Sequence, residues 1–271
     1  MGATPSVAVE KAGYFTVPGA HLYTVLHEVP NPVARVLLVG SFVAERHTAY
    51  IPWVRWARFL GARGIECLRY DYRAIGESTG VLEEMTFDHW IEDVQLLAGW
   101  LRAREPRVPL LLNGLEIGAI LAAKAFEAGS GDALLLWAAP ATAHEAIRSV
   151  IVRRVAIEYA FKFGDERKPV SQYIRDIENG QPLDLEGYRL PSRLWRDSFH
   201  VQLPRQLASE GGSFFPPVRP VRMVELDAKA APLVKGSSLL DDALARDLTP
   251  LFFENFQWIA QAMAIPSAGR Q

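Results

Sequence analysis

Short apolar runs alternate with amphipathic stretches through the first half of the chain. The continuous apolar runs have the length and composition of buried strands, at Arg35–Val39, Glu66–Tyr70, Val108–Leu112 and Ala133–Ala138. Apolar residues recur at helical spacing, or small residues run continuously, over Ile51–Leu60, Thr86–Arg104 and Ile117–Gly129. Alternation of strands and helices over residues 35–140 predicts a mainly parallel α/β sheet with helices on both faces.

The pattern changes at both ends of this region. Gly13–Val17 and His21–Val29 resemble two strands joined by the turn dipeptide Pro18-Gly19, and residues 1–12 are expected to form a loose arm. A strand pattern returns at Arg219–Asp227, and two helices are expected at 239–247 and 253–263. The predicted core is therefore made of residues 1–140 and 216–271.

Residues 141–215 do not follow the strand–helix alternation. They have a helical, charged pattern that is broken by Lys168-Pro169, by Asn179–Pro182 and by Leu190-Pro191. Ligands of open α/β sheets bind outside the carboxyl ends of the strands. We therefore expect this segment to form a helical lid or cap over that edge of the sheet.

Composition narrows the functional class. The chain has 271 residues, 49% of them hydrophobic, and a net charge of −2, which suits one α/β domain and does not favour nucleic acid or an anionic membrane. No apolar run reaches the about 18 residues of a membrane span, and no secretion signal is visible. The single cysteine, Cys67, is expected to be a buried strand thiol, and a cytoplasmic location is the default expectation.

One motif joins the run that ends near Asn113 to the small-residue helix. It reads Gly114-Leu115-Glu116-Ile117-Gly118, a Gly-x-Glu-x-Gly frame between a strand and a helix. The frame has the form of the Gly-x-Ser-x-Gly nucleophile elbow, in which the central residue has a strained backbone and the flanking glycines avoid collisions. Here glutamate stands where that motif has serine.

Three features together resemble the α/β-hydrolase superfamily. Besides the elbow frame, Asp71–Ser78 is similar to the Asp-x-Arg-Gly-x-Gly-x-Ser run of the serine-aminopeptidase-like branch, with Ala74 in place of the first glycine. Gly40-Ser41-Phe42 stands where the superfamily has His-Gly-aromatic. Ser41–Arg46 and Leu136–Pro140 are also similar to bacterial exosortase-system-associated hydrolases. The resemblance extends over about residues 10–265.

The resemblance implies a fold that cleaves esters, thioesters or amides with a Ser-His-Asp triad. Carried over to this chain, Glu116 takes the nucleophile position, and backbone N–H groups of Phe42 and Ile117 form the oxyanion hole. Asp227 takes the position of the acid. The general base has no counterpart, because no histidine follows Asp227 and the last one is His200.

The remaining histidines leave a displaced base open. His144 and His200, both within the expected lid, could reach the pocket, as could His47 near the first loop; exposed histidines are the commoner alternative. His89 and Asp93 share a helix face, but a metal site needs a third ligand, so we expect a surface pair and no metal. Asp71 and Arg73 are expected to pair and hold their loop.

Glu116 itself allows three interpretations. As a nucleophile it is one methylene longer than aspartate, and positioning errors of that size are costly. As a general base it would need burial to raise its pKa, whereas the start of the following helix favours the anion. In the third interpretation, the carboxylate fills the anion-receiving hole and has a structural role.

Two functional classes remain from the sequence. The first is a non-catalytic protein of this fold that binds a small acyl compound or a partner protein under its lid. The second is a working hydrolase with a rearranged site built on Glu116 and a histidine from elsewhere. Neither class requires a cofactor, and the oligomeric state is not readable from the sequence.

Overall fold

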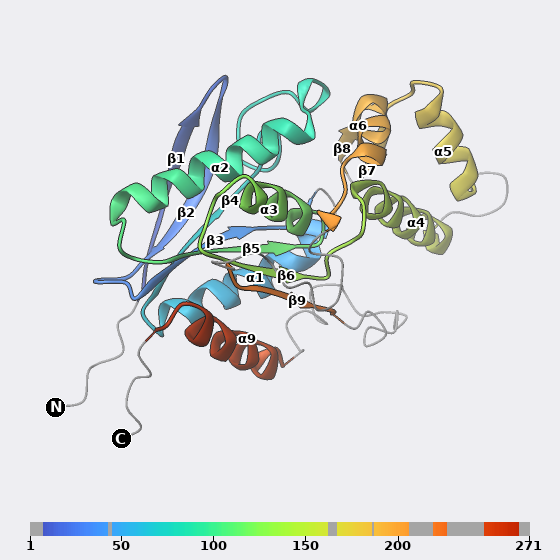
Figure 1. Cartoon of the computed structure of the whole chain (residues 1–271). Helices are drawn as coiled ribbons and strands as arrows, with labels where there is room; N and C mark the ends of the chain where they lie inside the picture. Colours follow the sequence, from blue (N-terminus) through green and yellow to red (C-terminus); the bar gives the residue numbers. More distant parts are fainter. Residues whose placement is uncertain are drawn as a thin grey trace.

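A computed structural model describes residues 8–42, 45–161, 167–185, 187–205, 219–226 and 247–265. Within these residues the chain forms one large central sheet with helices on both faces, and a further group of elements beyond one edge (Figure 1). The predicted helix at 239–247 lies almost entirely outside the described residues.

The central sheet has seven strands, in the order β1-β2-β4-β3-β5-β6-β9. The strands are β1 (Val9–Val17), β2 (Ala20–Glu28), β3 (Ala34–Val39), β4 (Ile65–Tyr70), β5 (Leu110–Leu115), β6 (Ala133–Trp137) and β9 (Val221–Val224). β1 and β2 pair antiparallel, as do β2 and β4, and every other neighbouring pair is parallel. The predicted mainly parallel α/β sheet is confirmed.

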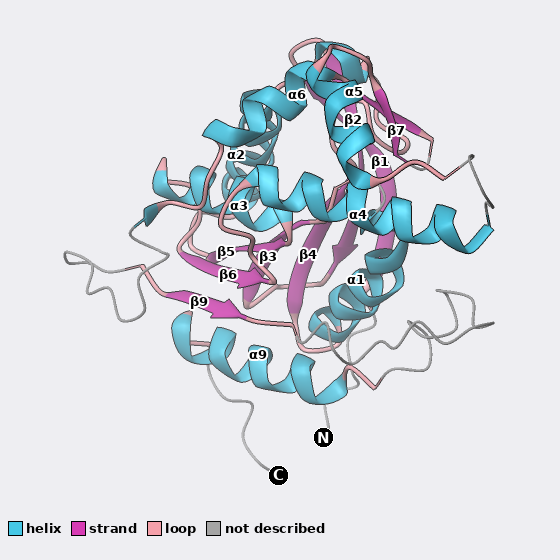
Figure 2. Cartoon of the chain, turned by 90° about the vertical axis from the view of Figure 1, so that its right-hand side faces the viewer, coloured by secondary structure: helices cyan, strands magenta, loops and turns pink. Residues whose placement is uncertain are grey.

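Helices cover both faces of this sheet (Figures 1 and 2). The helices α2 (Phe87–Arg104) and α3 (Ile117–Glu127) pack on one face, and α1 (Glu45–Gly61) and α9 (Thr249–Ala262) pack on the other. Consecutive strand residues point to opposite faces. Leu37 accordingly belongs to the α2 and α3 core, and Leu38 belongs to the α1 and α9 core.

The aromatic stripe of α1 is core, as its spacing predicts. Trp53 and Trp56 are buried, and their rings lie 5.7 and 5.2 Å from the ring of Trp137 at the end of β6. The Trp56 indole N–H donates to the Asn113 side chain at 2.8 Å, so the polar edge of the ring is also satisfied. Cys67 is fully buried in β4, again as expected.

The amino-terminal hairpin is longer than the pattern indicates. β1 begins at Val9, so the expectation of a loose arm through residue 12 is wrong for its last four positions. Every residue from Val9 to Val17 pairs with β2, including positions that carry exposed charged side chains. The turn forms at Pro18-Gly19, where the positive φ of 76° suits glycine.

Residues 141–215 contain helices and one unexpected hairpin. The helices are α4 (Ala143–Phe161), α5 (Val170–Glu178) and α6 (Ser192–Asp197), and the hairpin pairs β7 (Leu183–Leu185) with β8 (Tyr188–Leu190). The purely helical expectation for this segment is therefore wrong at β7 and β8. Figure 1 shows α4, α5 and α6 beyond the arrowheads of β3 and β5. The segment thus lies at the carboxyl edge of the parallel strands.

Within the described part of the chain, no helix combines the length and apolarity needed to cross a membrane.

Candidate functional site

The turn at Glu116 lies between β5 and α3, as the motif predicts. β5 ends at Leu115 and α3 begins at Ile117, which leaves Glu116 alone at the turn with φ 53° and ψ −123°. Non-glycine residues rarely adopt this conformation, which costs about 1–3 kcal/mol and is concentrated at functional sites. The Glu116 backbone N–H donates to the Trp137 carbonyl oxygen at 2.9 Å, which anchors the turn to β6.

The two flanking glycines are required by close backbone contacts. A Cβ atom at Gly114 would lie 2.4 Å from the Cα of Ala119, and one at Gly118 would lie 2.2 Å from the carbonyl oxygen of Gly40. Real Cβ atoms do not approach other atoms this closely. The glycine frame therefore brings α3 against β5 and against the loop that follows β3.

That loop, Gly40-Ser41-Phe42, is held by aromatic residues. The Tyr72 hydroxyl donates to the Gly40 carbonyl oxygen at 2.5 Å, and the Phe42 ring packs 4.7 Å from the ring of Trp90. Phe42 and Ile117 both line one cavity together with Glu116. The structure thus brings together the three residues that the sequence assigned to the nucleophile position and the oxyanion hole.

The cavity beside Glu116 has a volume of about 200 Å³. Its lining is formed by Phe42, Glu116, Ile117, Ala138, Pro140, Ala146, Ile147, Ser149, Val150 and Leu185. Four of these residues belong to α4 and one belongs to β7, so the segment 141–215 forms one wall. Apart from Glu116 and Ser149, these side chains are apolar.

Sequence reasoning did not find the α4 wall. Ala146, Ile147 and Val150 lie three and four positions apart, so they share one face of the helix. This spacing indicates an apolar helix face, although charged residues such as Glu145 and Arg148 lie between and beside these positions. The sequence does not show that this face of α4 lies opposite Glu116, which the structure establishes.

The Glu116 carboxyl group has little to compensate its burial. Its Oε2 atom is buried and has no hydrogen-bond partner in the structure. Burial raises the pKa of Glu116 from 4.5 to about 7. Of the two opposing influences identified in the sequence, the raised pKa is the effect expected of burial. Oε2 makes no hydrogen bond to the donors of an anion-receiving hole.

Neither lid histidine lines this cavity. His144 lies on α4, where its Nδ1 is 3.3 Å from Ser198 Oγ and its ring stacks on Phe199 at 3.7 Å. Burial, followed by the charge of Arg148, lowers the pKa of His144. His200 is exposed and ends a short 3₁₀ helix. The described residues that line the cavity with Glu116 include no histidine.

Two further candidates cannot be placed. Asp227, the expected acid, lies just beyond the described end of the β9 segment, outside the described residues. His47 lies within α1, but its side chain is outside the described part of the structure. Their expected roles stay predictions.

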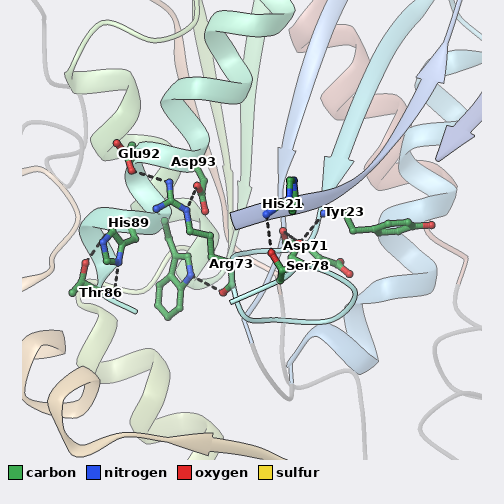
Figure 3. A network of polar contacts seen from close by, with 11 residues as sticks. His21, Tyr23, Asp71, Arg73, Ser78, Thr86, His89, Glu92 and Asp93 are labelled. Atoms are coloured by element: carbon green, nitrogen blue, oxygen red, sulfur yellow. Dashed lines mark hydrogen bonds and ion pairs between the residues drawn. The ribbon is translucent and has the colours of Figure 1, made fainter. Parts of the chain in front are cut away.

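A second polar network lies in the loop after β4 (Figure 3). The Arg73 guanidinium donates to Asp93 at 2.6 Å and to Glu92 at 2.8 Å. Both ion-pair partners of Arg73 are thus on α2. The prediction that Arg73 pairs with Asp71 is wrong. Asp93 is fully buried, so the expected surface pair of His89 and Asp93 is wrong.

His89 instead caps the start of α2. The Thr86 side chain accepts the His89 backbone N–H at 3.2 Å, and His89 Nδ1 accepts the Thr86 N–H at 3.3 Å. This reciprocal pair satisfies two backbone donors that the helix leaves free. Thr86 is thus the cap of α2, and the imidazole takes the place that glutamate or glutamine usually has.

Asp71 and Ser78 hold the same loop to β2. Asp71 Oδ2 accepts the Glu77 backbone N–H at 3.0 Å, and Ser78 Oγ donates to the Asp71 carbonyl oxygen at 2.7 Å. Ser78 Oγ also accepts the backbone N–H of Tyr23 at 2.8 Å (Figure 3). The side chains of Asp71 and Ser78 therefore both have a structural role in this loop. Across the described residues, no cluster of three or more His, Cys, Asp or Glu side chains could hold a metal ion.

Comparison with known proteins gives structural neighbours only. No family model matches the sequence, and no curated protein matches it. The α/β hydrolase GrgF from Penicillium sp. sh18 superimposes with a TM-score of 0.59 at 16% identity, covering 95% of this chain and 100% of GrgF.

Two further solved structures give similar superpositions. Est1E from Butyrivibrio proteoclasticus, solved with ferulic acid, has a TM-score of 0.59 at 14% identity, covering 93% of this chain and 100% of Est1E. A soluble variant of monoglyceride lipase from Saccharomyces cerevisiae has a TM-score of 0.56 at 13% identity, covering 96% of this chain and 97% of the lipase. With the parallel sheet and the strand–turn–helix at Glu116, these superpositions show that the chain has the α/β-hydrolase fold.

Proposed function

We propose that this protein binds a small, largely apolar ligand in the cavity beside Glu116 and does not hydrolyse it with a Ser-His-Asp triad. In this proposal residues 141–215 act as a lid, because α4 and β7 form one wall of the cavity. The observation that carries the proposal is the unpartnered Glu116 Oε2 in an otherwise apolar lining of about 200 Å³. A pocket of this kind, with few polar groups, is typical of small-molecule sites.

The chemistry of the lining supports binding over acyl transfer. A triad needs a nucleophile, a base within hydrogen-bond reach and a group that orients the base. Glu116 stands at the nucleophile position, and the described lining residues supply no imidazole. Without a base, a covalent ester on Glu116 would have no obvious route of release.

The structural neighbours also accept ligands. Est1E was solved with ferulic acid bound, and the yeast monoglyceride lipase was solved with a substrate analogue. These are properties of those two proteins. They support the proposal because the same fold offers its pocket at the carboxyl edge of the strands.

Two variants of α4 test the binding site. Val150 lines the cavity, whereas Val152 on the same helix is 42% exposed. We expect Val150→Trp to fill the cavity and to abolish the thermal stabilisation that short-chain alcohols or esters give the wild type. Val152→Trp is the matched control and should retain it. Equal stabilisation of both variants would contradict the proposal.

A screen for hydrolysis tests the absence of triad chemistry. Acyl esters of several chain lengths are offered to the wild type and to Glu116→Ala, and released acid is measured. We expect no turnover above background from either protein. Turnover by the wild type that Glu116→Ala loses would overturn the non-catalytic part of the proposal.

One observation favours a second candidate, a hydrolase in which Glu116 is the general base. A base works best when its pKa is near the working pH, and burial raises the pKa of Glu116 to about 7. This candidate requires a rate that rises with pH through about 7 as Glu116 ionises. The same esters followed from pH 5 to 9, with Glu116→Gln as the control, separate the two candidates.

A further inference from the structure

The composition of the cavity wall restricts the ligand. Among the described lining residues, Glu116 is the only titratable group, and Ser149 is the only other residue with a polar side chain. Glu116 Oε2 is buried without a partner. A buried polar group that lacks a hydrogen bond is destabilising, so a ligand that supplies the missing partner is favoured. The ligand is therefore expected to carry a polar group at one end.

The polar group has to suit two neighbours at once. A protonated carboxyl group has an O–H donor, which requires an acceptor on the ligand. The cavity also opens at the first turn of α3, since Ile117 lines it, and a helix start favours negative charge. A ligand carboxylate meets both conditions, because it accepts the O–H and places its charge at the helix start.

We propose that the cavity takes a small apolar monocarboxylate, whose carboxylate accepts a hydrogen bond from protonated Glu116 and whose hydrocarbon part lies against α4. This inference rests on the proposed binding function and names its ligand class. A dry protein cavity of about 150 Å³ holds one benzene molecule. The cavity of about 200 Å³ thus suits an acid of about six carbon atoms.

The pairing implies that binding depends on pH in one direction. Two carboxyl groups at short distance share one proton, because both cannot remain charged there. Below pH 7, Glu116 is protonated and the carboxylate binds. Above pH 7, each complex has to take up one proton, so the affinity falls about tenfold per pH unit.

The rest of the described lining of the cavity carries no charge. The loop 40–42, the segment 138–140, α3, α4 and β7 contribute the rest of the described lining, and none of their lining residues is charged. Tyr72, which reaches the same turn, has its pKa raised by burial and stays neutral over the whole range. The dependence on pH is therefore assigned to Glu116.

Calorimetry with two probes tests the inference. Sodium hexanoate and 1-hexanol are titrated into the wild-type protein from pH 5.5 to 9. We expect hexanoate to bind at pH 6 and to lose affinity about tenfold per pH unit above pH 7, whereas 1-hexanol binds with little change. In Glu116→Gln the amide N–H₂ remains a donor at every pH, so hexanoate affinity should become flat across the range.

The two probes also separate the inference from the proposed function. If 1-hexanol binds but hexanoate does not, or if hexanoate affinity is flat in the wild type, the monocarboxylate inference is overturned and the binding function stands. If neither probe binds, the proposed function fails with it. Val150→Trp should lose both probes and Val152→Trp should keep both, while circular dichroism establishes that each variant is folded.

Discussion

Two acids in this protein have the same raised pKa, but only one of them has a cationic partner. Burial raises the pKa of Asp93 and of Glu116 to about 7 in each case. Arg73 lies 2.6 Å from Asp93 and opposes that shift, whereas Glu116 Oε2 has no partner. The difference between the two acids is the cation at Asp93 Oδ1, because Asp93 Oδ2 is as unpartnered as Glu116 Oε2. Glu116 also lines a cavity, and acids with a raised pKa in a cavity are candidates for a functional site.

The backbone shows a related contrast. Glu116 at the elbow has φ 53°, and Ala74 in the Arg73 loop has φ 62°, both in the region that favours glycine. The Ala74 backbone N–H donates to the Thr79 carbonyl oxygen at 3.0 Å, in the loop that Asp71 and Ser78 also hold. Strain alone therefore does not identify a site; strain together with an unpartnered polar group does.

The largest expected effect comes from removing the partner of Asp93. In Arg73→Met the Asp93 carboxyl group stays buried without its cation, and breaking such a pair costs about 3–5 kcal/mol. We expect the free energy of unfolding at pH 7 to fall by about this amount. Glu116→Gln removes no described partner and should change stability much less. Urea denaturation of both variants measures the difference.

Glu92 supplies the matched control for this prediction. It contacts the same guanidinium, but its side chain is 46% exposed, so Glu92→Gln should cost less than about 1 kcal/mol. The double variant Arg73→Met with Asp93→Leu should recover part of the lost stability. If Arg73→Met and Glu92→Gln cost the same, Arg73 and Asp93 are not a buried, mutually dependent pair.

The second effect is a pH dependence that belongs to Glu116. Its pKa is about 7 in the folded chain against 4.5 in the unfolded one, so the unfolded chain ionises first as the pH rises. The associated stability is complete below pH 4.5, declines from there to about pH 7 and is then lost. Since one pKa unit corresponds to about 1.4 kcal/mol, the decline is at most about 3.5 kcal/mol.

Asp93 titrates in the same range and has to be subtracted. The measurement is therefore the unfolding free energy of the wild type minus that of Glu116→Gln, from pH 4 to 8. We expect this difference to fall with pH, while each protein alone retains the contribution of Asp93. A difference that stays constant would show that the Glu116 carboxyl group is solvated in the folded chain.

Much of the fold follows from the sequence because each strand and helix carries its own local signal. The runs that form β3 and β6 are continuous and apolar, and Trp53 and Trp56 recur at helical spacing. The hairpin formed by β7 and β8 has strands of only three residues, too short for a periodic pattern. The beginning of β1 was missed because Glu10 and Lys11 interrupt the apolar pattern there, although its backbone is fully paired.

The site is less predictable because its properties depend on distant elements. The motif places Glu116 at a turn, and the sequence alone cannot say whether burial or the helix start determines its pKa. The outcome depends on Ile147 and Val150 of α4, which close the cavity more than 30 residues along the chain. Asp93 was misjudged for the same reason, because its burial depends on Arg73 in another loop.

A third prediction concerns the elbow itself. Glu116→Ser restores the serine of the nucleophile motif in a glycine frame that already accepts it. A serine hydroxyl is a weak nucleophile until a base takes its proton. Without the base, a triad enzyme retains a rate only about 10³–10⁴-fold above that of the reaction in water. We therefore expect little or no turnover of simple acyl esters by this variant, measured as released acid, with slow acylation by an activated ester as the most that is gained.

The opposite outcome would identify a displaced base. Multiple-turnover hydrolysis by Glu116→Ser, lost again when His47, His144 or His200 is replaced, would require an imidazole that reaches the elbow. Phe42 and Ile117 would then act as oxyanion donors in a competent site. The contrast between the two buried acids would in that case reflect a lost nucleophile rather than a binding pocket.

The smallest expected effect relieves strain in the Arg73 loop. Ala74 occupies the left-handed region at φ 62°, where an L-residue pays about 1–2 kcal/mol. Ala74→Gly removes that cost, but glycine gains about 0.4–1 kcal/mol of freedom in the unfolded chain, and a partly buried methyl group is lost. We expect a net stabilisation of about 0.5 kcal/mol, or a melting temperature about 1–2 °C higher by calorimetry. Ligand binding beside Glu116 should be unchanged, because Ala74 does not line that cavity. A loss of stability would mean that the Ala74 methyl group contributes more through packing than its backbone conformation costs.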